Sequence, residues 1–215
     1  ETWADTYDPD WRATQICSSS VPQEPLYVPD SLAVVQILHA NGIGAEVGSV
    51  TAWQGGRVVR LALTSHTITS LPACIGDLDS LRGLVLEDAP LTATGLPPEI
   101  GNLGALKLIR MEGGQFTTLP DEFCHLHSLD TLSLYNGMLE SLPDSIGQLG
   151  NLKYVDLTAN NLQSVPESFS NCTGITILDL DQNELVDLPA GITSLQPVHW
   201  LNLAGNRLCL VSTAL

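Results

Sequence analysis

Basic residues are scarce in this chain of 215 residues: 8 Lys and Arg stand against 24 Asp and Glu, giving a formal charge of −16 and a pI near 4.3. A field of that sign repels phosphate groups, which excludes nucleic acid and anionic membrane surfaces as the main partners. No apolar run approaches the ~18 to 20 residues that span a bilayer. No basic segment followed by an apolar core opens the chain, so we expect any targeting segment to be absent or already removed.

Catalytic motifs are missing as well. The sequence has no H-E-x-x-H, no G-x-S-x-G and no glycine-rich phosphate loop ending in Lys, and it has only 2 lysines. We therefore predict neither enzymatic activity nor a cofactor. Asp156, Asp179 and Asp181 are weak candidate metal ligands, for which solvated carboxylates on an acidic protein are the alternative interpretation. The segment Cys124-His125-Leu126-His127 could supply soft ligands, but a structural or solvent-exposed role is favoured, and no metal site is predicted.

A repeat of about 23 residues dominates the chain from Val58 onward. In each unit, apolar residues at positions 1, 4 and 6 predict a short strand with one buried face. A single unit cannot bury its own apolar edge, so it must stack on its neighbours ~4.8 Å away in a parallel sheet. The repeat is marked by six apolar-Pro pairs, at Leu71-Pro72, Leu96-Pro97, Leu119-Pro120, Leu142-Pro143, Val165-Pro166 and Leu188-Pro189.

The full pattern, L-x-x-L-x-L-x-x-N-x-L-x-x-L-P-x-x-I-x-x-L-x-x, resembles the 23-residue type of the leucine-rich repeat family, with Leu-Pro at positions 14 and 15, as found in secreted bacterial proteins. The resemblance covers residues 58–215 and implies an α/β solenoid of about seven repeats, the last incomplete. It also implies a horseshoe with a parallel sheet on the concave face and 3₁₀ or irregular convex arcs. The family's Asn at position 9, which binds turn backbone, is present at Asn160, Asn183 and Asn206, whereas earlier repeats carry His66, Ala89, Gly114 and Gly137.

The segment before the repeats has two predicted parts. Residues 30–57 are expected to form a cap, in which Asp30 or Ser31 opens a helix and the side chains of Leu32, Val35 and Leu38 share a face. A strand over 50–53 leads from that helix into the first repeat. Residues 18–29, rich in Ser and Pro, predict an extended linker.

The two ends of the chain match each other in repeat phase. Leu215 occupies position 18 of the seventh repeat, and Trp3 falls on the apolar position 21 when the N-terminus is appended. Trp3, Tyr7 and Trp11 form an apolar stripe at helical spacing. The appended sequence is similar to the C-terminal cap of secreted bacterial leucine-rich repeat proteins, which implies pairing of Cys17 with Cys209.

In one copy these ends lie roughly 30 Å apart, beyond the reach of a disulfide. We hypothesise that residues 1–17 complete the last repeat of a neighbouring copy, giving a head-to-tail filament of chains or a tandem polypeptide. The alternative is that residues 1–17 pack on their own N-terminal cap. The predicted assembly residues are Trp3, Tyr7, Trp11, Cys17, Cys209, Val211 and Leu215.

Five cysteines leave at least one free or paired between molecules. Cys74, Cys124 and Cys172 lie two repeats apart and are expected to be buried apolar residues rather than bridges. A Cys17–Cys209 bridge would favour an extracellular or cell-surface, secreted protein. Asn171 begins a glycosylation sequon, which matters if the source glycosylates its proteins.

The outward strand positions predict a polarised concave face. Over the first three strands four basic and three acidic residues sum to +1, and over the next three one basic and four acidic residues sum to −3. We predict a structural subunit of an extracellular filament or array, and alternatively a recognition module that binds protein or glycan here. The candidate binding residues are Arg60, Arg82, Lys107, Leu108, Arg110, Tyr135, Tyr154, Asp156, Ile177, Asp179, Asp181 and Trp200.

Overall fold

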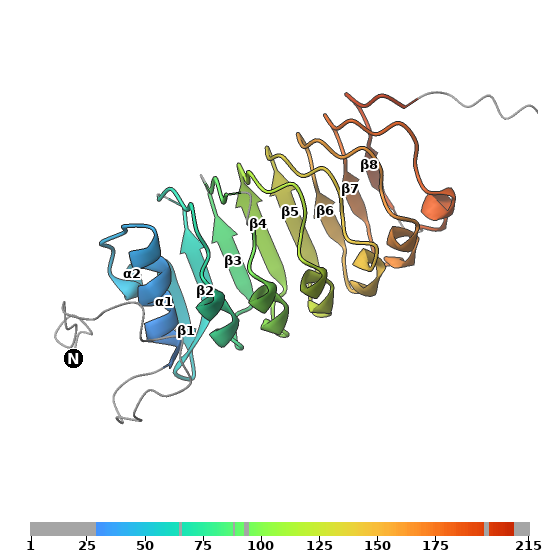
Figure 1. Cartoon of the computed structure of the whole chain (residues 1–215). Coiled ribbons are helices and arrows are strands. Elements are labelled where there is room, and N and C mark those ends of the chain that lie inside the picture. The colour runs from blue at the N-terminus through green and yellow to red at the C-terminus, as the bar shows by residue number, and fades with distance from the viewer. Residues whose placement is uncertain (1–28, 65, 88, 93–94, 196–197, 209–215) are drawn as a thin grey trace, which may run out of the picture.

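The computed structural model describes residues 29–64, 66–87, 89–92, 95–195 and 198–208. Its central element is an eight-stranded sheet whose strands follow one another in chain order along the molecule (Figure 1). The predicted solenoid is confirmed, except that β1 pairs antiparallel with β2, whereas β2 to β8 run parallel. The strands are β1 (Thr51–Gln54), β2 (Arg57–Leu63), β3 (Gly83–Leu86), β4 (Leu108–Glu112), β5 (Thr131–Tyr135), β6 (Tyr154–Asp156), β7 (Ile177–Asp179) and β8 (Trp200–Asn202).

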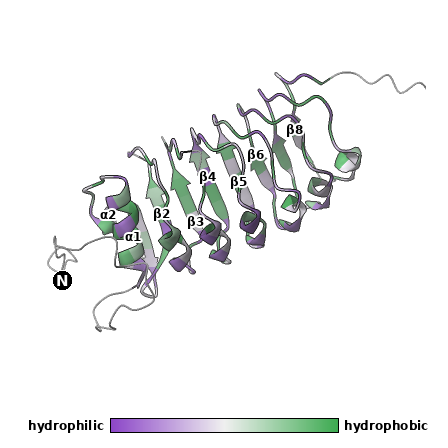
Figure 2. Ribbon diagram, in the orientation of Figure 1, coloured by the Kyte–Doolittle hydropathy of each residue, from purple (hydrophilic) through white to green (hydrophobic). Residues whose placement is uncertain are grey.

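Short 3₁₀ helices form the return arcs on the other side of the core (Figure 1). The proline of a Leu-Pro or Val-Pro pair immediately precedes five of these helices, where its fixed φ holds the chain extended before the turn. These helices mix hydrophilic and hydrophobic residues, whereas β3 and β4 are largely hydrophobic (Figure 2). They are η3 (Ala73–Asp77), η4 (Pro98–Asn102), η5 (Asp121–His125), η6 (Ile146–Gln148), η7 (Glu167–Asn171) and η8 (Ala190–Ser194).

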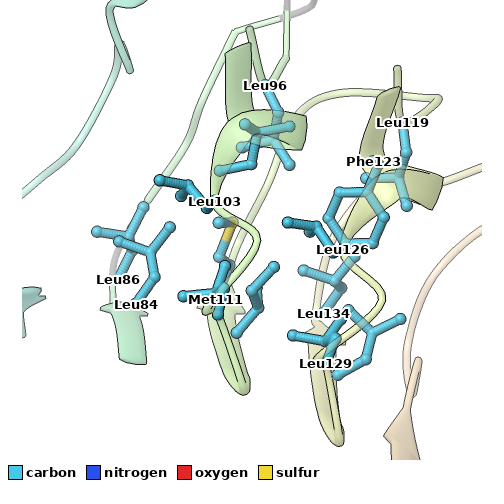
Figure 3. Packing of buried hydrophobic residues seen from close by; sticks show 14 of the residues in the cluster. Leu84, Leu86, Leu96, Leu103, Met111, Leu119, Phe123, Leu126, Leu129 and Leu134 are labelled. Atoms are coloured by element: carbon cyan, nitrogen blue, oxygen red, sulfur yellow. The ribbon is translucent and has the colours of Figure 1, made fainter. Parts of the chain in front are cut away.

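The core consists of apolar layers stacked between the sheet and the arcs. In Figure 3, Leu84, Met111 and Leu134 come from three successive strands, and Phe123 reaches the same core from an arc. Each layer is covered by the layers before and after it, so burial depends on stacking. At position 4 of the repeat, six successive side chains are 0% exposed: Leu61, Leu84, Ile109, Leu132, Val155 and Leu178.

The predicted asparagine ladder is present in the later repeats. Asn160 accepts a hydrogen bond through Oδ1 from the N–H of Leu139 in the preceding repeat, at 3.0 Å, and donates through Nδ2 to the carbonyl of Leu157, at 3.0 Å. Asn183 and Asn206 make the equivalent pairs of bonds. These bonds satisfy buried backbone groups that water cannot reach.

In earlier repeats the same position is filled differently. A Cβ on Gly137 would lie 2.9 Å from Oδ1 of Asn160, and a Cβ on Gly114 would lie 2.5 Å from the ring of Phe116. The buried Phe116 ring therefore occupies the space of the missing side chain. A cavity of about 10 Å³ borders these four residues, room for about one water molecule. Nδ1 of His66 is buried and has no hydrogen-bond partner among the described residues.

Helix α1 (Pro29–Ala40) and the short α2 (Val47–Val50) cover the β1 end of the core (Figure 1). The predicted apolar face of α1 is wrong for Leu32 and Val35, which are only half-buried. The buried stripe of α1 instead consists of residues at i, i+3, i+4, i+7 and i+8, and its first member, at position i, is the charged Asp30. Its members are Asp30, Ala33, Val34, Ile37 and Leu38.

An ion pair fixes this rotation of α1. The Asp30 side chain is 0% exposed, and its Oδ1 lies 3.0 Å from both Nε and Nη2 of Arg57. Its Oδ2 accepts a hydrogen bond of 2.7 Å from the N–H of Val58. The hydrogen bond to Asp30 is the main cause that raises the pKa of Arg57 above its usual value. Arg57 also contacts Asp79, whose side chain is 63% exposed, at 2.6 Å.

Asn41 forms a second link between the cap and the first repeat. Its Oδ1 accepts hydrogen bonds from the N–H groups of Thr69 and Ser70, at 2.8 and 3.0 Å. Its Nδ2 donates to the carbonyls of Ile37 and Ser70, at 2.7 and 2.8 Å. Gly42 follows with φ 66° and ends the helix.

Several predicted segments lie outside the described residues. Residues 1–17, with Trp3, Tyr7, Trp11 and Cys17, are among them, and so are Cys209, Val211 and Leu215. The completed last repeat and the Cys17–Cys209 bridge therefore stay predictions. The predicted linker over 18–29 overlaps the structure only at Pro29, which is the first residue of α1.

The two acidic partners of Arg57 provide a direct test of the cap. We expect Asp30→Ala to lower the free energy of unfolding by about 2 kcal/mol, because it leaves the buried N–H of Val58 without an acceptor and removes the main partner of Arg57. Asp79→Ala removes the exposed partner of the same Arg57 and should cost at most about 1 kcal/mol. Urea denaturation of the three proteins measures both effects, and equal losses in the two variants would contradict the assignment.

Candidate binding surface

The solvent-facing side of the sheet, here called the strand face, consists of side chains aligned in rows across the strands, with neighbouring strands ~4.8 Å apart. The register of the strands defines two complete rows. The first row contains Arg60, Gly83, Leu108, Thr131, Tyr154, Ile177 and Trp200. The second row contains Ala62, Val85, Arg110, Ser133, Asp156, Asp179 and Asn202.

Aromatic and aliphatic side chains dominate the later part of the first row. Tyr154 is 37% exposed and Trp200 is 58% exposed, with the half-buried Ile177 between them. Leu108, further toward the N-terminus, is also half-buried. Burial is the largest cause that raises the pKa of Tyr154, followed by the charges of the nearby aspartates. The phenol therefore stays neutral and presents an apolar ring with a polar tip.

Asp156 and Asp179 face each other on β6 and β7 in the second row. Each is held by the turn that follows its strand: Asp156 accepts from the N–H of Thr158 and Asp179 from the N–H of Asp181, both at 3.1 Å. Asp181 accepts a hydrogen bond from the neighbouring side chain of Gln182 at 3.1 Å. Within the described part of the chain, no three His, Cys, Asp or Glu residues are grouped as metal ligands.

A hydrogen-bonded cluster links β4 and β5 on the same face. Nη2 of Arg110 donates to the hydroxyl of Tyr135 at 3.3 Å, and that hydroxyl donates to Glu112 at 2.9 Å. The guanidinium of Arg110 also lies 5.5 Å from the centre of the Tyr135 ring, within cation–π range. The hydrogen bond to Tyr135 is the main cause that raises the pKa of Arg110. The cluster fixes the position of one cation on the strand face.

Three further cations lie beside this cluster. Arg60 is an exposed residue of β2, and the exposed Arg82 and Lys107 immediately precede β3 and β4, at the edge where the strands begin. Nη1 of Arg82 donates to Oε1 of Gln54 on β1, at 3.1 Å. Sequence reasoning missed Gln54, because it lies on the antiparallel strand outside the repeat pattern.

Sequence reasoning also missed Asn202 as a member of the second row. Its Oδ1 accepts from the N–H of Ala204 at 3.2 Å, and its Nδ2 donates to Asp179 at 3.4 Å. The same two-residue offset occurs at Asp156 and Asp179. An Asp or Asn two residues before a turn N–H is a recognisable signal in the sequence.

The β8 end of the core is less covered than the rest. Leu201 holds the same repeat position as Leu178 but is 48% exposed, against 0% for Leu178. Val198, Leu203 and Leu208 around it are only half-buried. Among the described residues, no further strand pairs with β8.

The central cysteines are buried, as predicted. Cys74, Cys124 and Cys172 are all buried, and burial raises the pKa of both Cys124 and Cys172 to about 11. His125 and His127, on either side of a buried Leu126, are exposed. The alternation explains why this Cys-His-Leu-His segment does not bring its side chains together as ligands. None of the described helices has the length and hydrophobicity needed to span a bilayer.

The buried thiols should be unreactive in the native protein. At pH 8 a thiol of pKa about 11 is ionised in only about one molecule per thousand, and the thiolate is the reactive form. We expect N-ethylmaleimide to label Cys124 and Cys172 only in denaturant, as read by peptide mass spectrometry. A Met138→Cys variant, at a side chain that is 51% exposed, is the control that should react at once. Labelling of Cys124 or Cys172 in the native protein as fast as the Met138→Cys control would contradict their burial.

The leucine rich repeat family model matches residues 129–185 and 150–208. No curated protein matches the sequence at a significant level. Among solved structures, a leucine-rich repeat protein of Leptospira interrogans is 32% identical and superposes with a TM-score of 0.63, covering 67% of this chain and 36% of that chain. This chain therefore spans about a third of the length of that protein.

Two plant structures share the architecture at lower identity. A plant ice-binding protein is 22% identical, with a TM-score of 0.63, and covers 83% of this chain and 71% of that chain. The leucine-rich repeat ectodomain of the Arabidopsis thaliana membrane receptor kinase GASSHO1/SCHENGEN3, in complex with CASPARIAN STRIP INTEGRITY FACTOR 2, is 20% identical with a TM-score of 0.60. It covers 74% of this chain and 26% of that chain. At these identities the likeness shows the fold alone.

Proposed function

Because this chain belongs to the leucine-rich repeat family, we propose that it is an extracellular recognition protein whose strand face binds a protein partner. The fold is a protein-interaction scaffold and is generally non-enzymatic. The observation that carries the proposal is the exposure of Tyr154 and Trp200 in one aligned row of the sheet. Exposed aromatic side chains are frequent anchors at protein interfaces, where they bury a large apolar area with few rotatable bonds.

A protein partner fits this row better than a glycan. Tyr154 and Trp200 would each stack on a sugar ring, but the aliphatic Ile177 lies between them in the same row. The three side chains form a continuous apolar strip, which suits the aliphatic and aromatic side chains of a polypeptide. The extracellular setting is supported by the plant ectodomain that shares the fold.

The strand face is tested by selection of ligands on the purified chain. We expect a phage library of random twelve-residue peptides to yield binders whose affinity falls about tenfold or more in a Tyr154→Ala/Trp200→Ala variant. The control is Met138→Ala, which truncates an exposed apolar side chain outside the aligned rows. Absence of binders, or binders unaffected by the double variant, would contradict the proposal. Binders limited to a glycan array would replace the protein partner by a sugar.

A second function, head-to-tail assembly, is favoured by the β8 end. Leu201 is 48% exposed, whereas the equivalent residue in each of the six preceding repeats is 0% exposed. We propose that a second copy covers this layer with its residues 1–17, whose Trp3, Tyr7 and Trp11 supply an apolar stripe at helical spacing. An interface of this heterologous kind extends into a filament unless its rotation closes a ring.

Assembly makes a prediction about Leu201. We expect the wild-type chain to associate with increasing concentration in analytical ultracentrifugation, and Leu201→Glu to weaken association at least about tenfold, because burying a leucine contributes about 1.5–3 kcal/mol. Met138→Glu places the same charge on a side chain of similar exposure, 51% against 48%, in the middle of the solenoid and should have no effect. A non-reducing gel should show a ladder if Cys17 pairs with Cys209 between copies. A monomer at every concentration would contradict assembly.

A further inference from the structure

Half of the basic residues of this acidic protein gather around three adjacent strands. Arg60, Arg82, Lys107 and Arg110 are four of its 8 Lys and Arg, and all four are exposed on or beside β2, β3 and β4. The ion pairs formed by the described residues use Arg57 and Arg207 instead. Among the described residues these four cations form no ion pair, and their exposure leaves them accessible to an external anion.

The floor between these cations is open. Gly83 lies between Arg60 and Leu108 in the first row. A Cβ built on Gly83 would have only Cγ of Arg60 within 4 Å, at 3.6 Å, so the backbone there is accessible from the strand face. The hydrogen bonds from Arg82 to Gln54 and from Arg110 to Tyr135 involve neutral partners, while the charge of Glu87 also acts on Arg110. A carboxylate placed over Gly83 would be surrounded by cations.

The other half of the strand face has the opposite charge. Asp156 and Asp179 are aligned on β6 and β7, and Asp181 follows in the turn. The turn N–H groups occupy one oxygen of each of the first two carboxylates, which fixes their positions without neutralising them. All three are partly exposed. The apolar rings of Tyr154 and Trp200 lie in the adjacent row.

This inference rests on the proposed function. We infer that the partner presents an extended segment that runs across the strands, with an acidic residue over β2 to β4 and a basic residue against Asp156 and Asp179. From β3 to β7 there are four strand spacings, about 19 Å. An extended chain advances about 3.3 Å per residue, so the two charges of the ligand lie about six residues apart. The apolar side chains between them contact Leu108 and Tyr154. A uniform polyanion is disfavoured because its second half would meet the aspartates.

The selection on the strand face tests this inference through the charges of its binders. We expect the selected twelve-residue peptides to be enriched in pairs of one Asp or Glu and one Lys or Arg that lie five to seven residues apart. A synthetic peptide with such a pair should bind about tenfold more weakly to Arg60→Gln/Lys107→Gln and to Asp156→Asn/Asp179→Asn, and its affinity should fall with added salt. The Asp→Asn changes keep the oxygen that accepts the turn N–H, so they remove charge with little change of shape.

Control variants neutralise exposed charges outside the aligned rows. Arg207→Gln and Asp144→Asn/Asp187→Asn should leave the affinity for the same peptide unchanged. The inference would be overturned if the selected peptides lacked the charge spacing and bound all charge variants with equal affinity. If the same peptides lost affinity for the Tyr154→Ala/Trp200→Ala variant, the proposed function would still hold. Binding of heparin that depends on Arg60 and Lys107, with no peptide selected, would overturn both.

Discussion

Every repeat of this molecule buries its apolar side chains only against the repeats before and after it. Leu61, Leu84 and Ile109 are each 0% exposed because a neighbouring layer lies on both sides of them. The constraint fixes the parallel register of β2 to β8, since one side chain per strand must fall in each layer. It also fixes the strand face, because residues that alternate with the buried ones are aligned in rows toward solvent. The fold and the candidate binding surface therefore both result from the same packing rule.

The two ends of the stack meet this constraint differently. At the β1 end, α1 covers the first layer and is oriented by the buried Asp30 and its partner Arg57. At the β8 end, Leu201 keeps nearly half of its surface in contact with solvent. Among the described residues, the sheet has an antiparallel β1 at one end and a parallel β8 with no further strand beside it at the other, which gives the solenoid a polarity. That polarity is what makes a head-to-tail contact geometrically different from a symmetric dimer.

Periodicity in the sequence was sufficient to predict the repeats and the strand rows, because both follow from apolar residues at a fixed spacing. The asparagine ladder was implied by the resemblance to the leucine-rich repeat family. The buried stripe of α1 was not predicted, because it begins at Asp30, whose burial depends on Arg57, 27 residues later. Two backbone features carry no residue signal: Ala159 and Gln182 adopt φ of 53° and 52°, a region that most side chains avoid. The hydrogen bonds of Asp156 and Asp179 to turn N–H groups were missed for a different reason, because these residues were considered only as metal ligands, solvated carboxylates or binding residues.

The exchange of Asn for smaller residues in the early turns changes what fills the interior of each turn. Around Gly114 the turn is filled by the ring of Phe116, whereas around Asn160 it is held by hydrogen bonds to buried backbone. Apolar contacts lose strength on cooling, while hydrogen bonds do not share that temperature dependence. On cooling, the early turns should therefore lose rigidity before the later turns. The difference in rigidity between the two halves of the solenoid should be largest near freezing.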